Sequence, residues 1–166
     1  MRPPQLPERF RLEYTTEDGS QKRPVMIHRA IMGSIERMMA ILMEHTGGRW
    51  PFWLSPRQIM VCSVNEAVRE YATHVHRVLQ EEEGFFADLD VSDNRLPKKI
   101  RAATQMRYNL VVVIGEQERL AGTVTVRRRG PVEQEKEDKQ QPQTTCSIAD
   151  FVALCRRLQQ RVEPEA

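Results

Sequence analysis

The chain has 166 residues, of which 40% are hydrophobic and 29% are charged, so it can bury a core and is not a disordered chain. Its net charge of +2 is too small to indicate nucleic-acid binding from the total alone, and any such binding would need basic residues gathered locally. The three cysteines are far apart, which excludes a disulfide framework and an all-cysteine zinc site.

The N-terminal segment predicts two strands joined by a turn. The first covers Leu6–Thr15, where apolar and charged side chains alternate as in a half-buried strand. Its apolar positions are Phe10, Leu12 and Tyr14. The turn is Glu17–Ser20, whose Asp-Gly pair supplies the positive φ of a hairpin, and Lys22–Ile27 returns as the second strand.

A strand, a glycine turn and a helix follow one another between Pro24 and Arg37. Val25–Ile27 is an apolar run of strand length, and Gly33-Ser34 is expected to turn the chain. From Ile35 onward apolar residues recur at helical spacing as far as about Thr46, where two glycines can end the helix. Backbone N–H groups and a fixed arginine can meet an anion in such a place.

The remainder predicts an α/β domain after a linker at Arg49–Pro56, which holds two prolines and two tryptophans. We expect the aromatic residues of the linker to pack into the domain junction rather than bind a ligand. Expected strands cover 58–64, 85–89, 108–115 and 120–129, and expected helices cover 66–83, 97–107 and 148–162. Polar residues 131–145 are expected to form a flexible loop. This alternation predicts a mixed sheet with helices on its faces.

Several motifs stand in a fixed order along the chain. They are His28-Arg29-Ala30, Gly33-Ser34, Glu36-Arg37, Trp50–Pro56, Asp88-Leu89, Lys99–Arg101, Tyr108–Gly115 and Gly122–Arg127. In this order they resemble class II aminoacyl-tRNA synthetases, and the threonyl-tRNA synthetase family in particular, from about Gln5 to Arg129. The resemblance implies a C-terminal part of such an enzyme. Residues 1–54 would be the end of its antiparallel catalytic sheet plus a helix, and residues 55–166 its anticodon-binding domain.

In the first part, the resemblance implies a share of an ATP and threonine site. Arg37 would stack on the adenine, while Ser34 and Gly33 would line the aminoacyl-adenylate pocket. His28 would be one of three protein ligands to a catalytic zinc that distinguishes threonine from valine. The family's other two zinc ligands, its phosphate-binding motif and its dimer motif have no match here. The chain is therefore expected to hold zinc weakly at most and not to catalyse by itself.

In the second part, the resemblance implies contacts with an anticodon loop. Arg101 matches a family arginine at that loop, and Glu118 and Arg127 match the pair that reads the middle anticodon guanine. A carboxylate can accept from guanine N1–H and N2–H, and an arginine can donate to O6 and N7. Asn94 is the candidate for a family asparagine within 90–96, where this chain has extra residues. Lys98 and Arg107 are interpreted as solvated.

The intact enzyme implied by the resemblance would use ATP and Mg²⁺ to esterify threonine to tRNA-Thr, would be a homodimer and would be cytoplasmic. A mitochondrial location stays open if a targeting segment is missing. No apolar run is long enough to span a membrane. Two alternatives are a non-catalytic tRNA-binding module and a synthetase-derived accessory protein that binds a protein partner.

Overall fold

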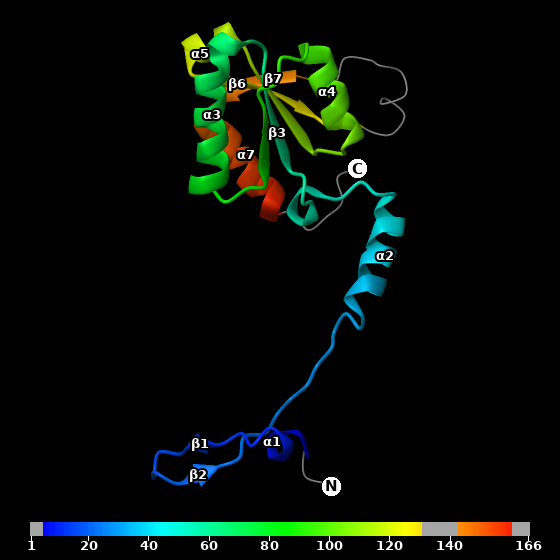
Figure 1. Cartoon of the computed structure of the whole chain (residues 1–166), viewed down its shortest axis with the longest axis vertical. Helices are drawn as coiled ribbons and strands as arrows, with labels where there is room; N and C mark the ends of the chain where they lie inside the picture. Colours follow the sequence, from blue (N-terminus) through cyan, green and yellow to red (C-terminus); the bar gives the residue numbers. More distant parts are fainter. Residues whose placement is uncertain (1–4, 131–142, 161–166) are drawn as a thin grey trace. The chain divides into compact units, whose positions relative to one another are not determined.

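The computed structural model describes residues 5–130 and 143–160. The chain divides into two compact units, Met1–Leu42 and Met43–Ala166, and each is described by itself. The prediction of a strand and helix mixture is confirmed, since a small antiparallel sheet precedes a mixed five-stranded sheet with helices (Figure 1).

The first unit contains the expected hairpin, but with much shorter strands. Strand β1 (Tyr14–Thr15) pairs antiparallel with β2 (Gln21–Lys22), and Gly19 has the positive φ that the turn needs. The strand predicted from Leu6 is wrong at its start, where α1 (Gln5–Arg9) forms instead. The strand predicted at 22–27 is also wrong beyond Lys22, and Ile27 is 87% exposed. An apolar run becomes a strand only when it can pair and bury one face, and neither occurs here within the residues described.

Helix α2 (Ile35–Thr46) has the predicted bounds. The backbone carbonyl of Ser34 accepts the first helical hydrogen bond from Met38, and Gly47 and Gly48 both have positive φ after the last turn. None of the twelve residues of α2 is buried, so the apolar stripe seen in the sequence stays exposed in this structure.

The second unit is built on a sheet with the strand order β4-β3-β5-β6-β7. Its strands are β3 (Ile59–Ser63), β4 (Ala87–Asp90), β5 (Leu110–Ile114), β6 (Thr123–Arg128) and β7 (Gln143–Ser147). β3 pairs parallel with β4 and with β5, whereas the pairs β5–β6 and β6–β7 are antiparallel. Residues 131–142 of the predicted loop lie outside the described residues, and Gln143–Thr145 belongs to β7, so the loop prediction is wrong there.

Helices cover both faces of this sheet, as predicted. The predicted helix at 66–83 is a 3-10 turn η2 (Glu66–Val68), an α-helix α3 (Arg69–Arg77) and a π-helical end η3 (Val78–Glu82). α3 and α7 (Ile148–Gln160) lie on one side of the sheet and α4 (Leu96–Gln105) on the other (Figure 1). A short helix α5 (Glu116–Ala121) was not predicted.

Two apolar clusters hold the layers together. The larger one joins α3 and α7 to the sheet through side chains such as Val61, Val75, Val112, Val124 and Phe151. The smaller one joins α4 to the opposite face through Cys62, Ala103, Tyr108 and Val111. On the sheet face that α4 covers, the polar residues lie outside the smaller cluster. They are on the exposed side of α4 and on the neighbouring parts of β6 and β7.

One residue of the linker, Phe52, is part of the core of the second unit. Phe52, in the 3-10 turn η1 (Phe52–Leu54), is 2% exposed, and its ring meets Phe85 edge-on at a centroid distance of 6.1 Å. Phe52 is therefore packed, as expected of the linker aromatics, but its contacts lie in the core of the second unit, and packing into a domain junction stays a prediction. Trp53, by contrast, is 39% exposed.

Candidate functional site

Beside α4, the sheet presents a strip of polar side chains. Thr125 and Arg127 of β6 pair with Val113 and Val111 of β5, and Val111 packs under α4. Because side chains alternate along a strand, Thr125 and Arg127 share the α4 face. Thr145 and Gln143 stand opposite them on β7 and are exposed. We call these four residues and the exposed side of α4 the polar α4 face.

Arg127 lies on this face with one hydrogen-bond donor left without a partner among the residues described. Its guanidinium Nε is buried and has no hydrogen-bond partner among the residues described. A buried donor without a partner costs free energy, so it favours an added acceptor. The next residue, Arg128, alternates to the other face, where its charge acts on the thiol of Cys155 in α7. The two arginines therefore differ in orientation although they are adjacent in sequence.

Glu118 is held in place by two hydrogen bonds at the start of α5. Its Oε2 accepts from the backbone N–H of Gly115 at 2.9 Å, and its Oε1 accepts from the hydroxyl of Thr125 at 2.7 Å. Partial burial by itself raises the pKa of Glu118. The hydrogen bonds from Thr125 and from the backbone N–H groups of Glu118 and Gly115 outweigh this and lower it below 4.5. A carboxylate has about four acceptor positions, so Glu118 keeps acceptor capacity for a ligand.

Arg101 is on the exposed side of α4. No hydrogen bond or ion pair holds its guanidinium to another residue of the described chain. Pro97 in the first turn suits the start of the helix, and the backbone N–H of Met106 bonds to the carbonyl of Ala102 at its end. Arg101 thus projects from a rigid element as a solvated cation, whereas Arg127 is partly enclosed.

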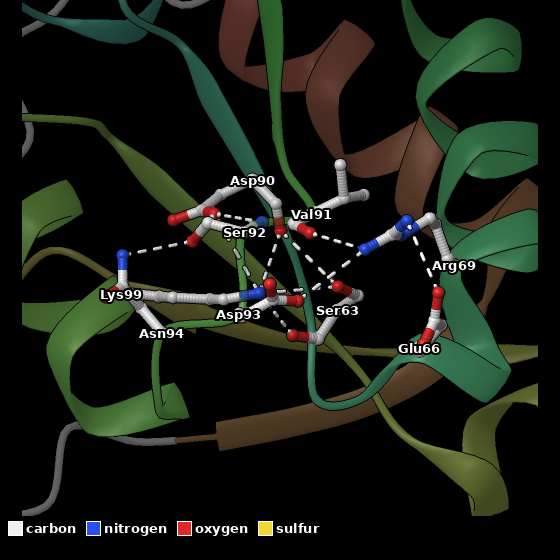
Figure 2. A network of polar contacts seen from close by, with 9 residues as sticks. All are labelled: Ser63, Glu66, Arg69, Asp90, Val91, Ser92, Asp93, Asn94 and Lys99. Atoms are coloured by element: carbon white, nitrogen blue, oxygen red, sulfur yellow. Dashed lines mark hydrogen bonds and ion pairs between the residues drawn. The ribbon is translucent and has the colours of Figure 1, made fainter.

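Asn94 belongs to a short loop, residues 90–94, that is closed by its own side chains (Figure 2). The Asp90 carboxylate accepts from the backbone N–H of Ser92 at 2.9 Å and from its hydroxyl at 2.6 Å. The Asn94 amide donates to the Ser92 hydroxyl at 3.1 Å and accepts from Lys98 at 3.0 Å. The extra residues noted at 90–96 therefore fold into a defined loop that presents Asn94 at the surface.

Two basic side chains hold this loop from opposite sides (Figure 2). Arg69 of α3 donates to the Val91 carbonyl at 3.1 Å and lies 3.8 Å from the Asp93 carboxylate. Lys99 of α4 donates to the Asp90 carbonyl at 3.2 Å from the other side. Partial burial by itself raises the pKa of Asp90, but hydrogen bonds from Ser92 and the nearby Lys99 ammonium bring it below 3.8.

A small hollow of about 160 Å³ opens beside the loop, at the carboxyl ends of β3 and β4. Its lining includes Asn65, Arg69, Ser92 and Asn94. Ligands of open α/β sheets commonly bind at this edge.

The residues predicted for a nucleotide and zinc site lie in the first unit. His28 and Arg37 are exposed, and Gly33 has a positive φ of 63°. The Ser34 hydroxyl donates to the carboxylate of Glu36, which lowers the pKa of that carboxyl. These contacts are local to the turn and the start of α2.

Zinc does not fit the donor set of the residues that the structure describes. Among residues 5–130 and 143–160 no three side chains of His, Cys, Asp or Glu come together as a metal site. His28 alone supplies one ligand, and a zinc site needs at least three from protein.

Within the same residues, no helix is long and apolar enough to cross a membrane.

The family model for the anticodon binding domain matches residues 58–158. The chain belongs to this family. A second model, the tRNA synthetase class II core domain (G, H, P, S and T), matches residues 2–46. The two matches confirm the resemblance that the motifs indicated.

The relatives of the chain carry one enzyme name. The chain is 44% identical over 157 residues to the cytoplasmic threonine–tRNA ligase of Saccharomyces cerevisiae, and the match covers 93% of this chain and 21% of the relative. It is 51% identical over 126 residues to the mitochondrial threonine–tRNA ligase 1 of Arabidopsis thaliana, covering 75% of this chain and 18% of the relative. The chain thus spans about a fifth of the length of the curated relatives that it matches. These names do not favour the accessory-protein alternative.

A solved structure is similar over nearly the whole chain. It is the RNA binding domain of threonyl-tRNA synthetase from Cryptosporidium parvum, with 42% identity and a TM-score of 0.68, covering 93% of this chain and 36% of that chain. The prediction that the chain resembles a part of a threonyl-tRNA synthetase is confirmed.

Sequence reasoning missed two residues that shape the site. Thr125 was seen only as a strand residue, yet its hydroxyl bonds to Glu118 and lies 2.9 Å from the hydroxyl of Thr145. Lys99 has no role in the sequence analysis beyond its place in the motif Lys99–Arg101, yet it is 3% exposed and points inward. Its spacing from Leu96 and Ala103, at three and four residues, marks the apolar stripe of α4 and could have revealed this.

Proposed function

We propose that this chain is the anticodon-binding part of a threonine–tRNA ligase and that its polar α4 face binds the anticodon loop of tRNA-Thr. The observation that carries the proposal is Arg127, which lies on the polar α4 face and whose buried Nε has no partner among the described residues. The names of the relatives and the match to the anticodon binding domain support the same substrate.

In this proposal Arg127 and Glu118 read the middle guanine of the anticodon. Arg127 donates to O6 and N7, and Glu118 accepts from N1–H and N2–H with its remaining lone pairs. Because the pKa of Glu118 is lowered below 4.5, the carboxylate is ionised at neutral pH and both of its oxygens act only as acceptors. Arg101 and Asn94 contact the loop from α4 and from the segment before it. Unstacked loop bases expose the edges that these side chains need.

The first unit contributes to a site that only a longer protein completes. We propose that Gly33 and Ser34 line an aminoacyl-adenylate pocket, that Arg37 stacks on adenine, and that His28 is a single member of a zinc site. ATP, Mg²⁺, threonine and a second subunit belong to the activity of that longer protein. The 166-residue chain alone is not competent for ligation, because positioning and charge stabilisation need several groups at once.

Relatives with cytoplasmic and mitochondrial names both occur, and a cytoplasmic location is proposed for the protein from the larger number of cytoplasmic names among those compared.

The test compares two adjacent arginines. The full chain is titrated with the anticodon stem-loop of tRNA-Thr and with the same stem-loop carrying adenine in place of the middle guanine. Arg127→Met is expected to abolish the preference for guanine, a loss of about 1–3 kcal/mol in discrimination. Arg128→Met removes the same charge from the opposite face and is expected to keep that preference.

The outcomes separate the possibilities. Equal binding of both stem-loops by the unaltered chain would refute the assignment of Arg127 and Glu118 as readers of the middle base. Absence of stem-loop binding at low salt would refute the proposed function as a whole. Equal loss of preference in both arginine variants would show a general charge effect instead of base recognition.

A further inference from the structure

Lys99 is the one lysine or arginine side chain of α4 that turns inward. In α4 and the residues next to its two ends, the exposed basic residues are Arg95, Lys98, Arg101 and Arg107. Lys99 itself is 3% exposed and extends between α4 and the sheet (Figure 2). A buried lysine is costly unless its charge is compensated and its N–H groups are bonded, so its environment has to be accounted for atom by atom.

Each N–H of the Lys99 ammonium has an acceptor. Nζ lies 2.9 Å from the Ser63 carbonyl, 3.3 Å from the Ser63 hydroxyl and 3.2 Å from the Asp90 carbonyl. Three acceptors match the three donors of the protonated amine. The Asp90 carboxylate, 3.8 Å away, supplies the opposite charge. The Ser63 hydroxyl in turn donates to the Asp90 carbonyl at 3.4 Å, which closes the group into one network.

This network joins three elements at a single point. Ser63 is the last residue of β3, Asp90 is the last residue of β4, and Lys99 is in the first half of α4. The ammonium thus fixes α4 to the carboxyl ends of two neighbouring parallel strands. The Asp90 carboxylate that faces Lys99 also organises the loop that carries Asn94.

We propose that Lys99 is a positioning residue for RNA recognition, which holds α4 and the 90–94 loop so that Arg101 and Asn94 meet the RNA in one fixed geometry. The inference rests on the proposed function. Lys99 does not touch the RNA, because its amine is enclosed by Ser63 and Asp90. It acts through Arg101, two residues further along the same helix, and through the loop closed by Asp90.

Lys98 provides a matched control. It is the adjacent lysine, it is exposed, and its amine bonds to the side chain of Asn94 rather than to the strands. Lys99→Met and Lys98→Met remove the same charge from neighbouring positions. Where Lys98 pairs with an RNA phosphate, its replacement reduces the slope of log binding constant against log salt concentration. Lys99→Met acts through the placement of Arg101, so it is expected to change that slope no more than Arg101→Met does.

The experiment uses the full chain and the anticodon stem-loop of tRNA-Thr. Far-UV circular dichroism first shows that each variant is folded at the assay temperature. Lys99→Met is expected to weaken binding by about ten- to a hundredfold, the scale on which a misplacement of about 1 Å acts. In a double-mutant cycle, Lys99→Met is expected to have little further effect once Arg101→Met is present. Folded Lys99→Met protein with normal affinity, or effects that simply add, would overturn the inference.

A second measurement does not depend on RNA. Hydrogen exchange of the Ser92 amide, which donates to Asp90, is expected to accelerate in Lys99→Met and to stay protected in Lys98→Met. Unchanged protection in Lys99→Met would overturn the positioning role even if no variant bound RNA. If the unaltered chain fails to bind the stem-loop while Ser92 responds as expected, the proposed function fails and the structural part of the inference stands.

Discussion

The linker before the α/β domain offers a sharp test of the fold, because two adjacent aromatic residues have opposite environments. Phe52 is 2% exposed and meets Phe85 edge-on at an interplanar angle of 66°, whereas Trp53 is 39% exposed. The Phe52 carbonyl also accepts from the side chain of Gln58 at 2.9 Å, so the turn is tied to the start of β3. Phe52→Ala is expected to lower the free energy of unfolding by about 3–5 kcal/mol, the usual cost of emptying a buried phenylalanine site.

Part of that cost is the lost aromatic pair, which contributes about 0.5–1.5 kcal/mol. At about 3–5 °C for each kcal/mol in a domain of this size, the Tm should fall by about 9–25 °C. Trp53→Ala is expected to cost less than about half as much. Urea and thermal unfolding are followed by far-UV circular dichroism, because removing a tryptophan changes the fluorescence signal. Equal losses in the two variants, or less than about 1 kcal/mol for Phe52→Ala, would refute the assignment of Phe52 to the domain core.

Three further predictions concern the polar α4 face and the first unit. Thr125→Val removes the hydroxyl that donates to Glu118. It should lower the free energy of unfolding by about 1–2 kcal/mol, measured by unfolding, and raise the pKa of the Glu118 carboxyl, measured by NMR titration. Thr125→Ser keeps the hydroxyl and is the control. Because the pKa of Glu118 is lowered on folding, its contribution to stability is present above about pH 4.5 and is lost as the pH falls through the folded value. Glu118→Gln should remove that part of the acid dependence, and an unchanged pH profile would contradict the assignment. Addition of zinc or of a chelator should leave the Tm unchanged, since His28 is a single ligand among the residues described, and a rise in Tm with zinc would contradict this.

Much of the α/β unit could be predicted from the sequence, because its two central strands are short apolar runs buried on both faces. β5 (Leu110–Ile114) and β3 (Ile59–Ser63) follow this pattern, and both fall within the predicted ranges. β7 could not be found in this way, since Gln143–Ser147 is a polar segment at the edge of the sheet and has no apolar run. α5 is six residues long, too short for a helical period to be recognised.

The first unit shows the limit of pattern reasoning. Alternating residues up to Tyr14 predicted a half-buried strand, yet Phe10 is 64% exposed and the pairing is confined to two residues in each strand. Periodicity tells which side chains could share a buried face, but it does not supply the partner that buries them. The same holds for α2, which forms with its predicted bounds although none of its residues is buried.

The sequence offers candidate site residues, but it does not show how the fold places them. Arg101 and Arg127 were singled out by motif, and only the fold separates Arg127 from Arg128 by face. Lys99 was placed correctly in its helix and given no role, because a set of basic residues in sequence does not say which one turns inward. Burial and the positions of acceptor atoms are properties of the tertiary structure, so neither can be obtained from spacing alone.

Glu118 shows why its role in recognition has to be tested indirectly. Its two oxygens already accept from Gly115 and Thr125, so an alanine substitution would leave the helix-capping N–H of Gly115 without its partner and the buried Thr125 hydroxyl with only Thr145. Weaker RNA binding in Glu118→Ala could then come from a displaced α5 as readily as from the missing guanine acceptor. Thr125→Val removes one hydrogen bond to the Glu118 carboxylate and leaves the lone pairs proposed to accept from guanine. Arg127→Met removes the proposed donor to the other edge of the same base. If Glu118 reads guanine, the decreases in discrimination in these two variants should be coupled rather than additive.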